Sequence, residues 1–321
     1  MSSIGNGIPK AEVMVLTFSI KNIFEHNIEL LGETDKAIYY FREQKYEKAL
    51  TIVANSMDGI KAVVEAIIED HEYFNLVETE SLLDMLAGIL NAKMNKDFIL
   101  LADLLELQLV TLLIGVQELI ISKEEIAFDE ENYKDNLQLL MSRGVGMEEC
   151  FKDPINTESL LEQGYRVEFT SGGRMTLAAH NNDATFYFHT NSLVQSEAFT
   201  LARHWTKANK KKYIIYGYGM GYHVLELLDI DAECEVEVYE ADRNVLQLAC
   251  AFAGVNRRIV NNKRAKVIYD PTYSGLKERI EKIAEDEVFL LHYPSYMNIR
   301  DAEIKPLFHS QMGWLEAMES I

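Results

Sequence analysis

The sequence predicts an α + α/β protein, in which an N-terminal all-α helical domain precedes a small β meander and a Rossmann-like, doubly wound parallel sheet. Three observations predict this class. Apolar residues recur at helical spacing through the first 141 residues, strands alternate with helices after residue 145, and residues 211–228 read as strand, glycine-rich turn and helix. Helical periodicity stops near residues 143–146, so we expect domains at 1–145 and 146–321.

Composition is that of a globular protein, because 48% of the 321 residues are hydrophobic and 26% are charged. The three cysteines, Cys150, Cys234 and Cys250, have no metal or redox spacing and read as reduced thiols. Residues 1–10 lack the pattern of a signal peptide. Polar residues interrupt the apolar stretch from Phe98 to Ile121, which favours a bundle helix over a membrane span. We therefore expect a cytoplasmic protein.

The charge is concentrated in the first half. Residues 1–150 hold 12 Lys and Arg against 27 Asp and Glu, a net of −15, and the rest of the chain adds −5 to reach −20. An acidic surface repels phosphate backbones and anionic lipid. We therefore expect neither a nucleic acid nor a membrane as a partner.

Helices account for the whole first half. One covers residues 11–31 and ends near Gly32, and a second begins with N-cap chemistry at Thr34 and Asp35. Residues 39–50 resemble a tetratricopeptide hairpin, but no repeat follows at the period of 34 residues that such arrays need. Further helices are expected over 57–70, 81–94, 96–122 and 129–141. This domain offers no chemistry, so we expect it to mediate dimerisation or docking on a protein partner.

Strands dominate the start of the second half. Three strand patterns at 166–170, 175–179 and 184–189, with turn residues between them, predict an antiparallel meander. A helix over 192–207 follows. Four further strands are expected to form the parallel sheet, each followed by a helix, at residues 211–216, 236–240, 265–270 and 287–292.

The turn after the first of these strands carries the strongest functional signal. Its residues include Gly217, Tyr218, Gly219 and Gly221, and such a turn lets the backbone bend tightly and offers amide groups to an anionic ligand. Glu240 ends the next strand about 20 residues later, where Rossmann folds bind ribose hydroxyls. We expect a nucleotide-type ligand here, the alternative being a scaffold whose crevice is empty or repurposed.

Other candidates map to the same edge, because the carboxyl ends of parallel strands lie together. They are Asp270, which ends the third strand, and the loop from His292 to Tyr296. His223 lies beside the glycines and is either a ligand contact or a structural residue. No catalytic residue can be assigned, although His292 is the best general-base candidate. The histidines have no metal-ligand spacing, so no metal site is predicted.

Several short motifs in the second half resemble the N-terminal, Rossmann-like region of the motility accessory factor (Maf) glycosyltransferases, a region formerly grouped with the pterin diphosphokinase-like proteins. The motifs are Asn156-Thr157 with Ser159-Leu160-Leu161, residues 171–177, His189-Thr190-Asn191-Ser192, Ser196-Glu197-Ala198, the glycine turn, residues 238–242 and His292-Tyr293-Pro294-Ser295. In that family the transferase domain lies beyond this region, and this sequence does not contain it. The resemblance implies an accessory protein that binds a nucleotide or nucleotide-sugar.

A second function class fits the same residues. In S-adenosylmethionine-dependent methyltransferases a glycine turn, an acid after the second strand and an acid after the third bind the cofactor, an order that Glu240 and Asp270 match. The loop from Tyr293 to Tyr296 is similar to one that positions target amines in some of these enzymes, the alternative being that Pro294 and Tyr296 are ordinary loop residues. A nicotinamide dehydrogenase fits less well, because the glycine spacing differs. The sequence names neither substrate nor oligomeric state.

Overall fold

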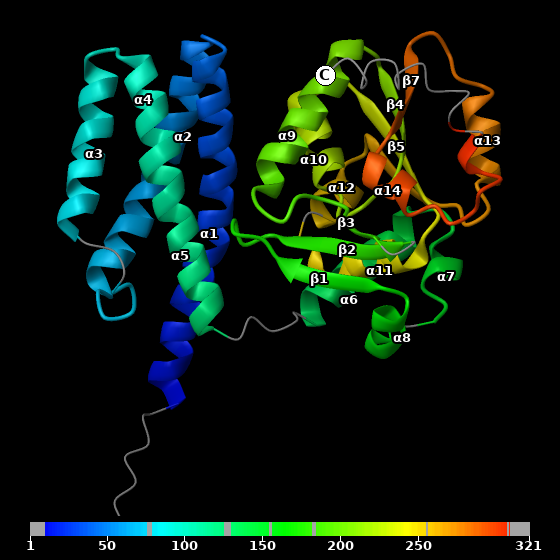
Figure 1. The fold of residues 1–321 in the computed structure, drawn as a ribbon, viewed down its shortest axis with the longest axis horizontal. Coiled ribbons are helices and arrows are strands. Elements are labelled where there is room, and N and C mark those ends of the chain that lie inside the picture. Colours follow the sequence, from blue (N-terminus) through cyan, green and yellow to red (C-terminus); the bar gives the residue numbers. More distant parts are fainter. Residues whose placement is uncertain are drawn as a thin grey trace, which may run out of the picture. The chain divides into compact units, whose positions relative to one another are not determined.

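The computed structural model describes residues 10–75, 79–124, 130–153, 156–181, 184–254, 256–306 and 308. The chain divides into two compact units (Figure 1). A helical unit comprises the residues up to 126 together with 171–173, and an α/β unit comprises 127–170 and 174–321. The predicted α + α/β class is confirmed.

The units divide at residue 127, whereas the change of pattern predicted from the sequence lies near 145. The difference arises from helix α6 (Glu130–Arg143), which is helical in pattern but packs on α11 and α12 of the α/β unit. Its buried Asn136 donates to the Cys250 carbonyl, and Arg143 donates to the Val260 carbonyl. Periodicity identifies a helix without showing which core that helix joins.

The helical unit contains α1 (Lys10–Arg42), α2 (Tyr46–Glu69), α3 (Thr79–Met94), α4 (Phe98–Leu104), a π-helical turn η1 (Leu105–Leu109) and α5 (Val110–Lys123). The expected break at Gly32 is wrong, because α1 runs through it. A glycine inside a helix costs about 1 kcal/mol, and burial of neighbouring Leu30 and Leu31 in the bundle outweighs that cost.

The segment Phe98–Lys123 is the one helix among the described residues that is long and apolar enough to cross a membrane, with a mean hydropathy of 2.1 and 39% of that apolar stretch buried. Helices in the core of a globular protein can be equally long and apolar. Gln117, fully buried, donates to the Phe24 carbonyl, and Asn27 donates to the Leu113 carbonyl, so one face of this segment packs on α1. The cytoplasmic location stays a prediction.

The α/β unit is built on a parallel sheet of β4 (Lys212–Tyr216), β5 (Glu235–Glu240), β6 (Ala265–Tyr269) and β7 (Glu287–Leu291). The spatial order β6-β5-β4-β7 places the first parallel strand beside the second and the fourth, which is the Rossmann order. Alternate residues of β4 enter different cores: Ile215 packs in one and Ile214 in the other. The sheet is therefore covered on both faces, as a doubly wound fold requires.

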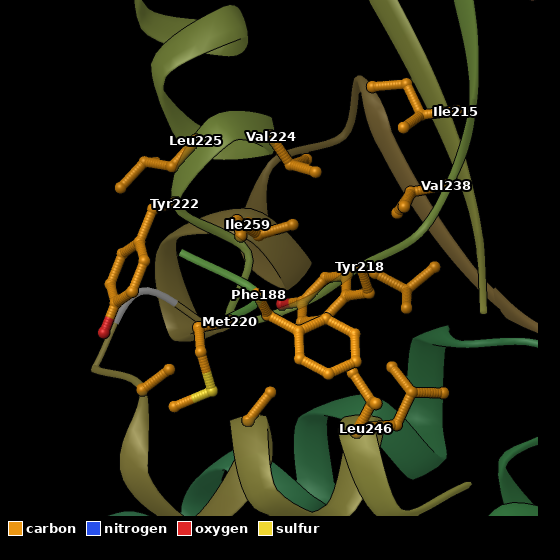
Figure 2. Packing of buried hydrophobic residues seen from close by; sticks show 14 of the residues in the cluster. Phe188, Ile215, Tyr218, Met220, Tyr222, Val224, Leu225, Val238, Leu246 and Ile259 are labelled. Carbon is orange, nitrogen blue, oxygen red and sulfur yellow. The ribbon is translucent and has the colours of Figure 1, made fainter. Parts of the chain in front are cut away.

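Helices α9 (Val194–Trp205), α10 (Tyr222–Ile230), α11 (Arg243–Phe252) and α12 (Asn256–Asn261) contribute to the larger core. Figure 2 shows Tyr218 of the glycine turn beside Phe188 and Leu246 in this core. The smaller core includes α13 (Ser274–Ile280) and Phe308, and α14 (Tyr293–Met297) follows β7. A further helix, which the sequence predicts from Lys305 or Pro306 onward, lies mostly outside the described residues.

The meander forms as predicted from β1 (Tyr165–Phe169), β2 (Met175–Asn181) and β3 (Ala184–Tyr187), in the order β1-β2-β3. Its strands are antiparallel, with Val167 opposite Leu177 and Ala179 opposite Phe186. Two short helices before it, α7 (Met147–Cys150) and α8 (Thr157–Glu162), were not predicted. Asn156 caps α8 by accepting a hydrogen bond from the Ser159 amide.

Candidate functional site

The glycine turn connects β4 to α10 at the carboxyl edge of the sheet, as predicted. Gly217, Gly219 and Gly221 all have positive φ, at 104°, 52° and 82°, which explains the glycine at every second position. The N-terminus of α10 follows at once. A glycine turn that leads into a helix N-terminus is the arrangement found in phosphate-binding Rossmann turns.

The amides of this turn, however, already have acceptors within the protein. Gly217 donates to the Tyr239 carbonyl at 2.7 Å and Tyr218 donates to Glu240 Oε2 at 2.9 Å. Met220 donates to His189 Nε2 at 3.2 Å, and Gly221 donates to the Tyr218 carbonyl at 2.8 Å. Four of the five amides from 217 to 221 are therefore engaged within the protein.

Side chains also fill the space that the glycines create. A Cβ atom at Gly217 would lie 2.4 Å from both Cβ and Oγ of Ser295, and one at Gly219 would lie 2.9 Å from His189 Nε2. Tyr218 points into the core, where its hydroxyl bonds to Asn256 and burial raises its pKa well above the usual value. The close approach that glycine permits is made here by the protein's own side chains.

Glu240 lies at the predicted position but is 2% exposed. Its Oε2 accepts from the Tyr218 amide, and its Oε1 accepts from the amides of Ala241 and Asp242 at 3.0 and 2.9 Å. Burial, reinforced by the charge of Asp242, raises the pKa of Glu240 to about 7 although the three amides favour the ionised form. Glu240 therefore joins the glycine turn to the loop after β5.

Asp270 also serves a local role, since its Oδ2 accepts from the Leu276 amide at 2.8 Å and thereby caps α13. Its own amide donates to the Glu240 carbonyl, so the two predicted acids do share one edge. Tyr296 is partly exposed, with Lys305 Nζ 5.7 Å from its ring centroid. The structure thus groups Glu240, Asp270 and the glycines, while Tyr296 contacts the C-terminal segment.

Three buried histidines meet behind the glycine turn, which the sequence did not predict. They are His189 after β3, His223 in the first turn of α10 and His292 after β7, and one ring nitrogen of each lies within 4.8 Å of the others. The rings of His223 and His292 stack with centroids 4.3 Å apart and planes 3° apart. His223 and His292 were separate candidates, but nothing in their spacing linked them to His189.

Each histidine has a partner outside the cluster. His189 Nδ1 contacts Glu197 Oε1 at 3.3 Å, His223 Nε2 contacts the Gly217 carbonyl at 3.0 Å, and His292 Nδ1 contacts Ser295 Oγ at 2.8 Å. Burial, with the neighbouring histidines adding to it, lowers the pKa of His223 to about 3 and that of His292 well below its usual value. His223 and His292 are therefore neutral near pH 7.

No family model matches the chain, and no curated protein matches it. Among solved structures, the chain is similar to MnmC2 from Aquifex aeolicus, with 18% identity and a TM-score of 0.25. That match covers 52% of this chain and 57% of the other, so the chain spans little more than half of that structure. The assignment of a Rossmann-like fold therefore rests on the strand order and the glycine turn.

Proposed function

We propose that this chain is a non-catalytic accessory protein, in which the α/β unit is a Rossmann-like scaffold and the helical unit binds a partner protein. The engaged amides of the glycine turn carry this proposal. A nucleotide needs free amides at the turn and a free carboxylate after the second strand. Here Glu240 already accepts three amide hydrogen bonds, and Ser295 fills the space at Gly217.

A panel of ligands tests the scaffold role. S-adenosylmethionine, S-adenosylhomocysteine, CMP, UDP and NAD, each at millimolar concentration, should leave the melting temperature unchanged. A ligand present at 100 times its Kd would stabilise the fold by about 2.7 kcal/mol, which a thermal melt detects easily.

The methyltransferase alternative is supported by one observation, the shared edge of the glycine turn, Glu240 and Asp270. A melting-temperature increase with S-adenosylhomocysteine that Glu240→Gln abolishes would favour it and overturn the scaffold role. The relation to motility accessory factors is a proposal that rests on the order of short motifs. Binding of CMP or UDP at the turn would support the nucleotide-sugar form of that proposal.

The partner-binding role is supported by a groove between α3 and α5 with a volume of about 1160 Å³. Leu104, Leu107 and Leu112 contribute apolar surface to it. The acids on its lining are Glu80, Asp84 and Glu118, and the lining that the structure describes includes no lysine or arginine. Six large apolar side chains of α3, α4 and η1 are exposed: Leu83, Leu90, Met94, Ile99, Leu100 and Leu107.

A groove lined by leucines and acids fits an amphipathic helix whose apolar stripe is flanked by lysines or arginines. The acidity of this half of the chain argues against a second copy as the occupant, because like charges repel across an interface. We therefore assign the groove to a basic amphipathic helix of a partner protein.

A labelled model helix of leucine and lysine probes the groove by fluorescence anisotropy. Leu107→Gln should weaken binding at least tenfold, and added salt should weaken it further. Leu161→Gln is the matched control, because Leu161 is 57% exposed on α8 of the other unit. Equal binding by both variants would refute the groove, and a dimer that Leu107→Gln dissociates would show that the groove binds a second copy instead.

A further inference from the structure

The histidine cluster has a property that packing alone does not explain. His223 is fully buried, and its Nδ1 is a buried nitrogen without a hydrogen-bond partner. Its Nε2 faces the Gly217 carbonyl, which places the proton on Nε2 and leaves Nδ1 with a free lone pair. Buried polar atoms without partners are rare, and an ion or a water molecule is the usual explanation.

The outer contacts of the cluster are those that metal-binding histidines make. Such a ligand usually donates its second nitrogen to a carboxylate or a carbonyl, which fixes its tautomer and orientation. His189 Nδ1 faces the carboxylate of Glu197, and His223 Nε2 faces a carbonyl. Glu197 is itself held in place, because its Oε2 accepts from the Thr190 amide at 2.6 Å.

The hydrogen bonds that His189 and His292 now make at the proposed ligand positions are weak enough for a metal ion to replace them. His189 Nε2 accepts a 3.2 Å hydrogen bond from the Met220 amide, and His292 bonds to the Ser295 hydroxyl and to the Phe188 backbone. Hydrogen bonds between neutral groups are worth about 1 kcal/mol each. The absence of a side chain at Gly219 keeps the space between His189 and His292 open, since a Cβ there would lie 2.9 Å from one ring and 3.2 Å from the other.

We propose that His189, His223 and His292 bind one divalent transition-metal ion, with Zn²⁺ as the representative ion. Neutral imidazoles are good ligands for Zn²⁺, Co²⁺, Ni²⁺ and Cu²⁺ and poor ones for Mg²⁺ and Ca²⁺. Three histidines leave a fourth position for water or another ligand. The ion would join three segments of the α/β unit, those after β3, after β4 and after β7.

Binding requires a local rearrangement. Tetrahedral coordination at about 2.1 Å holds ligand nitrogens roughly 3.4 Å apart, which is closer than the 4.8 Å limit found here. An imidazole binds an ion in its own ring plane, and the stacked planes of His223 and His292 cannot both contain one ion. One of these two rings must therefore turn about its Cβ–Cγ bond when the ion binds.

The test uses the full chain without an affinity tag, purified without chelator and then dialysed. Titration with Co²⁺ should reach one ion per chain, with the visible absorption of four-coordinate Co²⁺, and Zn²⁺ should displace it. His223→Gln should weaken Co²⁺ binding at least tenfold. His204→Gln, which changes an exposed histidine of α9, should bind as the unaltered chain does.

Two further measurements distinguish a loss of metal binding from a folding defect. Zn²⁺ should raise the melting temperature of the unaltered chain and leave that of His223→Gln unchanged, with both proteins folded by circular dichroism. Glu197→Gln should weaken Zn²⁺ binding about tenfold, because it removes the carboxylate that orients His189. Absence of stoichiometric Co²⁺ binding, or equal binding by His223→Gln and His204→Gln, would overturn the proposal. A buried water molecule would then be the partner of His223 Nδ1.

Discussion

Replacement of Gly217 by alanine tests whether the glycine turn serves internal packing. At φ = 104° an L-residue is strained, which costs about 1–3 kcal/mol. The new methyl group would lie 2.4 Å from Ser295 Cβ and 2.8 Å from His292 Cβ, and overpacking of this kind costs a further 1–3 kcal/mol. We expect Gly217→Ala to destabilise the α/β unit by about 4 kcal/mol.

Ser295→Gly separates the two contributions. It removes the closest contacts and leaves the backbone strain, so the double variant should regain part of the loss, with a coupling energy of about 1–2 kcal/mol. Gly254→Ala is the control in the same unit, because nothing lies within 4 Å of its Cβ position. It should change stability by less than about 1 kcal/mol.

Urea unfolding measures these differences through the fluorescence of Trp205, which is buried in the α/β unit, in a background that carries Trp314→Phe. Local fluorescence is preferable to a global signal, because a chain with two compact units need not unfold in one step. A loss below 1 kcal/mol for Gly217→Ala, or no recovery with Ser295→Gly, would refute the packing explanation and return the glycine to a ligand-binding role.

Three further predictions concern stability. Burial, followed by the charge of Glu106, raises the pKa of Asp35 to about 7. The folded state therefore binds the Asp35 proton more tightly than the unfolded chain does, and the stability of the fold decreases as the pH rises from about 4 to 7. Asp35→Asn should remove this pH dependence and stabilise the helical unit by roughly 2–4 kcal/mol at pH 8, measured by urea unfolding. Glu240→Gln should destabilise the α/β unit by about 1–3 kcal/mol, because the nitrogen of the new amide group cannot accept the hydrogen bond from the Tyr218 N–H. Unchanged stability would refute the role of Glu240 in joining the glycine turn to the loop after β5. Gly115→Ala in α5 should stabilise the helical unit by up to about 1 kcal/mol, because alanine favours a helix more than glycine does and nothing lies within 4 Å of the new Cβ atom. A higher melting temperature would show this gain.

Local pattern predicted the α/β architecture well. The period-two strands and the glycine turn are encoded by neighbouring residues, so the meander and the parallel strands were predictable. The break at Gly32 was wrong because tertiary packing extends a helix through an unfavourable residue. The unit to which α6 belongs depends on contacts with residues more than 100 positions away, such as Asn136 with Cys250.

The site was less predictable, because the same residue types at the same positions can either bind a ligand or stabilise the protein's own loops. An acid at the end of β5 has the same sequence signature whether it binds ribose or, as Glu240 does here, the amides of its own loops. The histidine cluster had no signature at all. His189, His223 and His292 come from three segments, and only the strand order and the turn bring them together.

The position of β4 has a consequence for how the protein is made. It is an inner strand, paired with β5 on one side and with β7 on the other, where Tyr213 lies opposite Val288. The helices of the first unit come earlier in the chain and can form while the ribosome is still producing the sheet. Until residues 287–291 emerge, one side of β4 is an open apolar edge of the kind that promotes aggregation. The nascent chain therefore passes through a stage in which that edge has no partner strand.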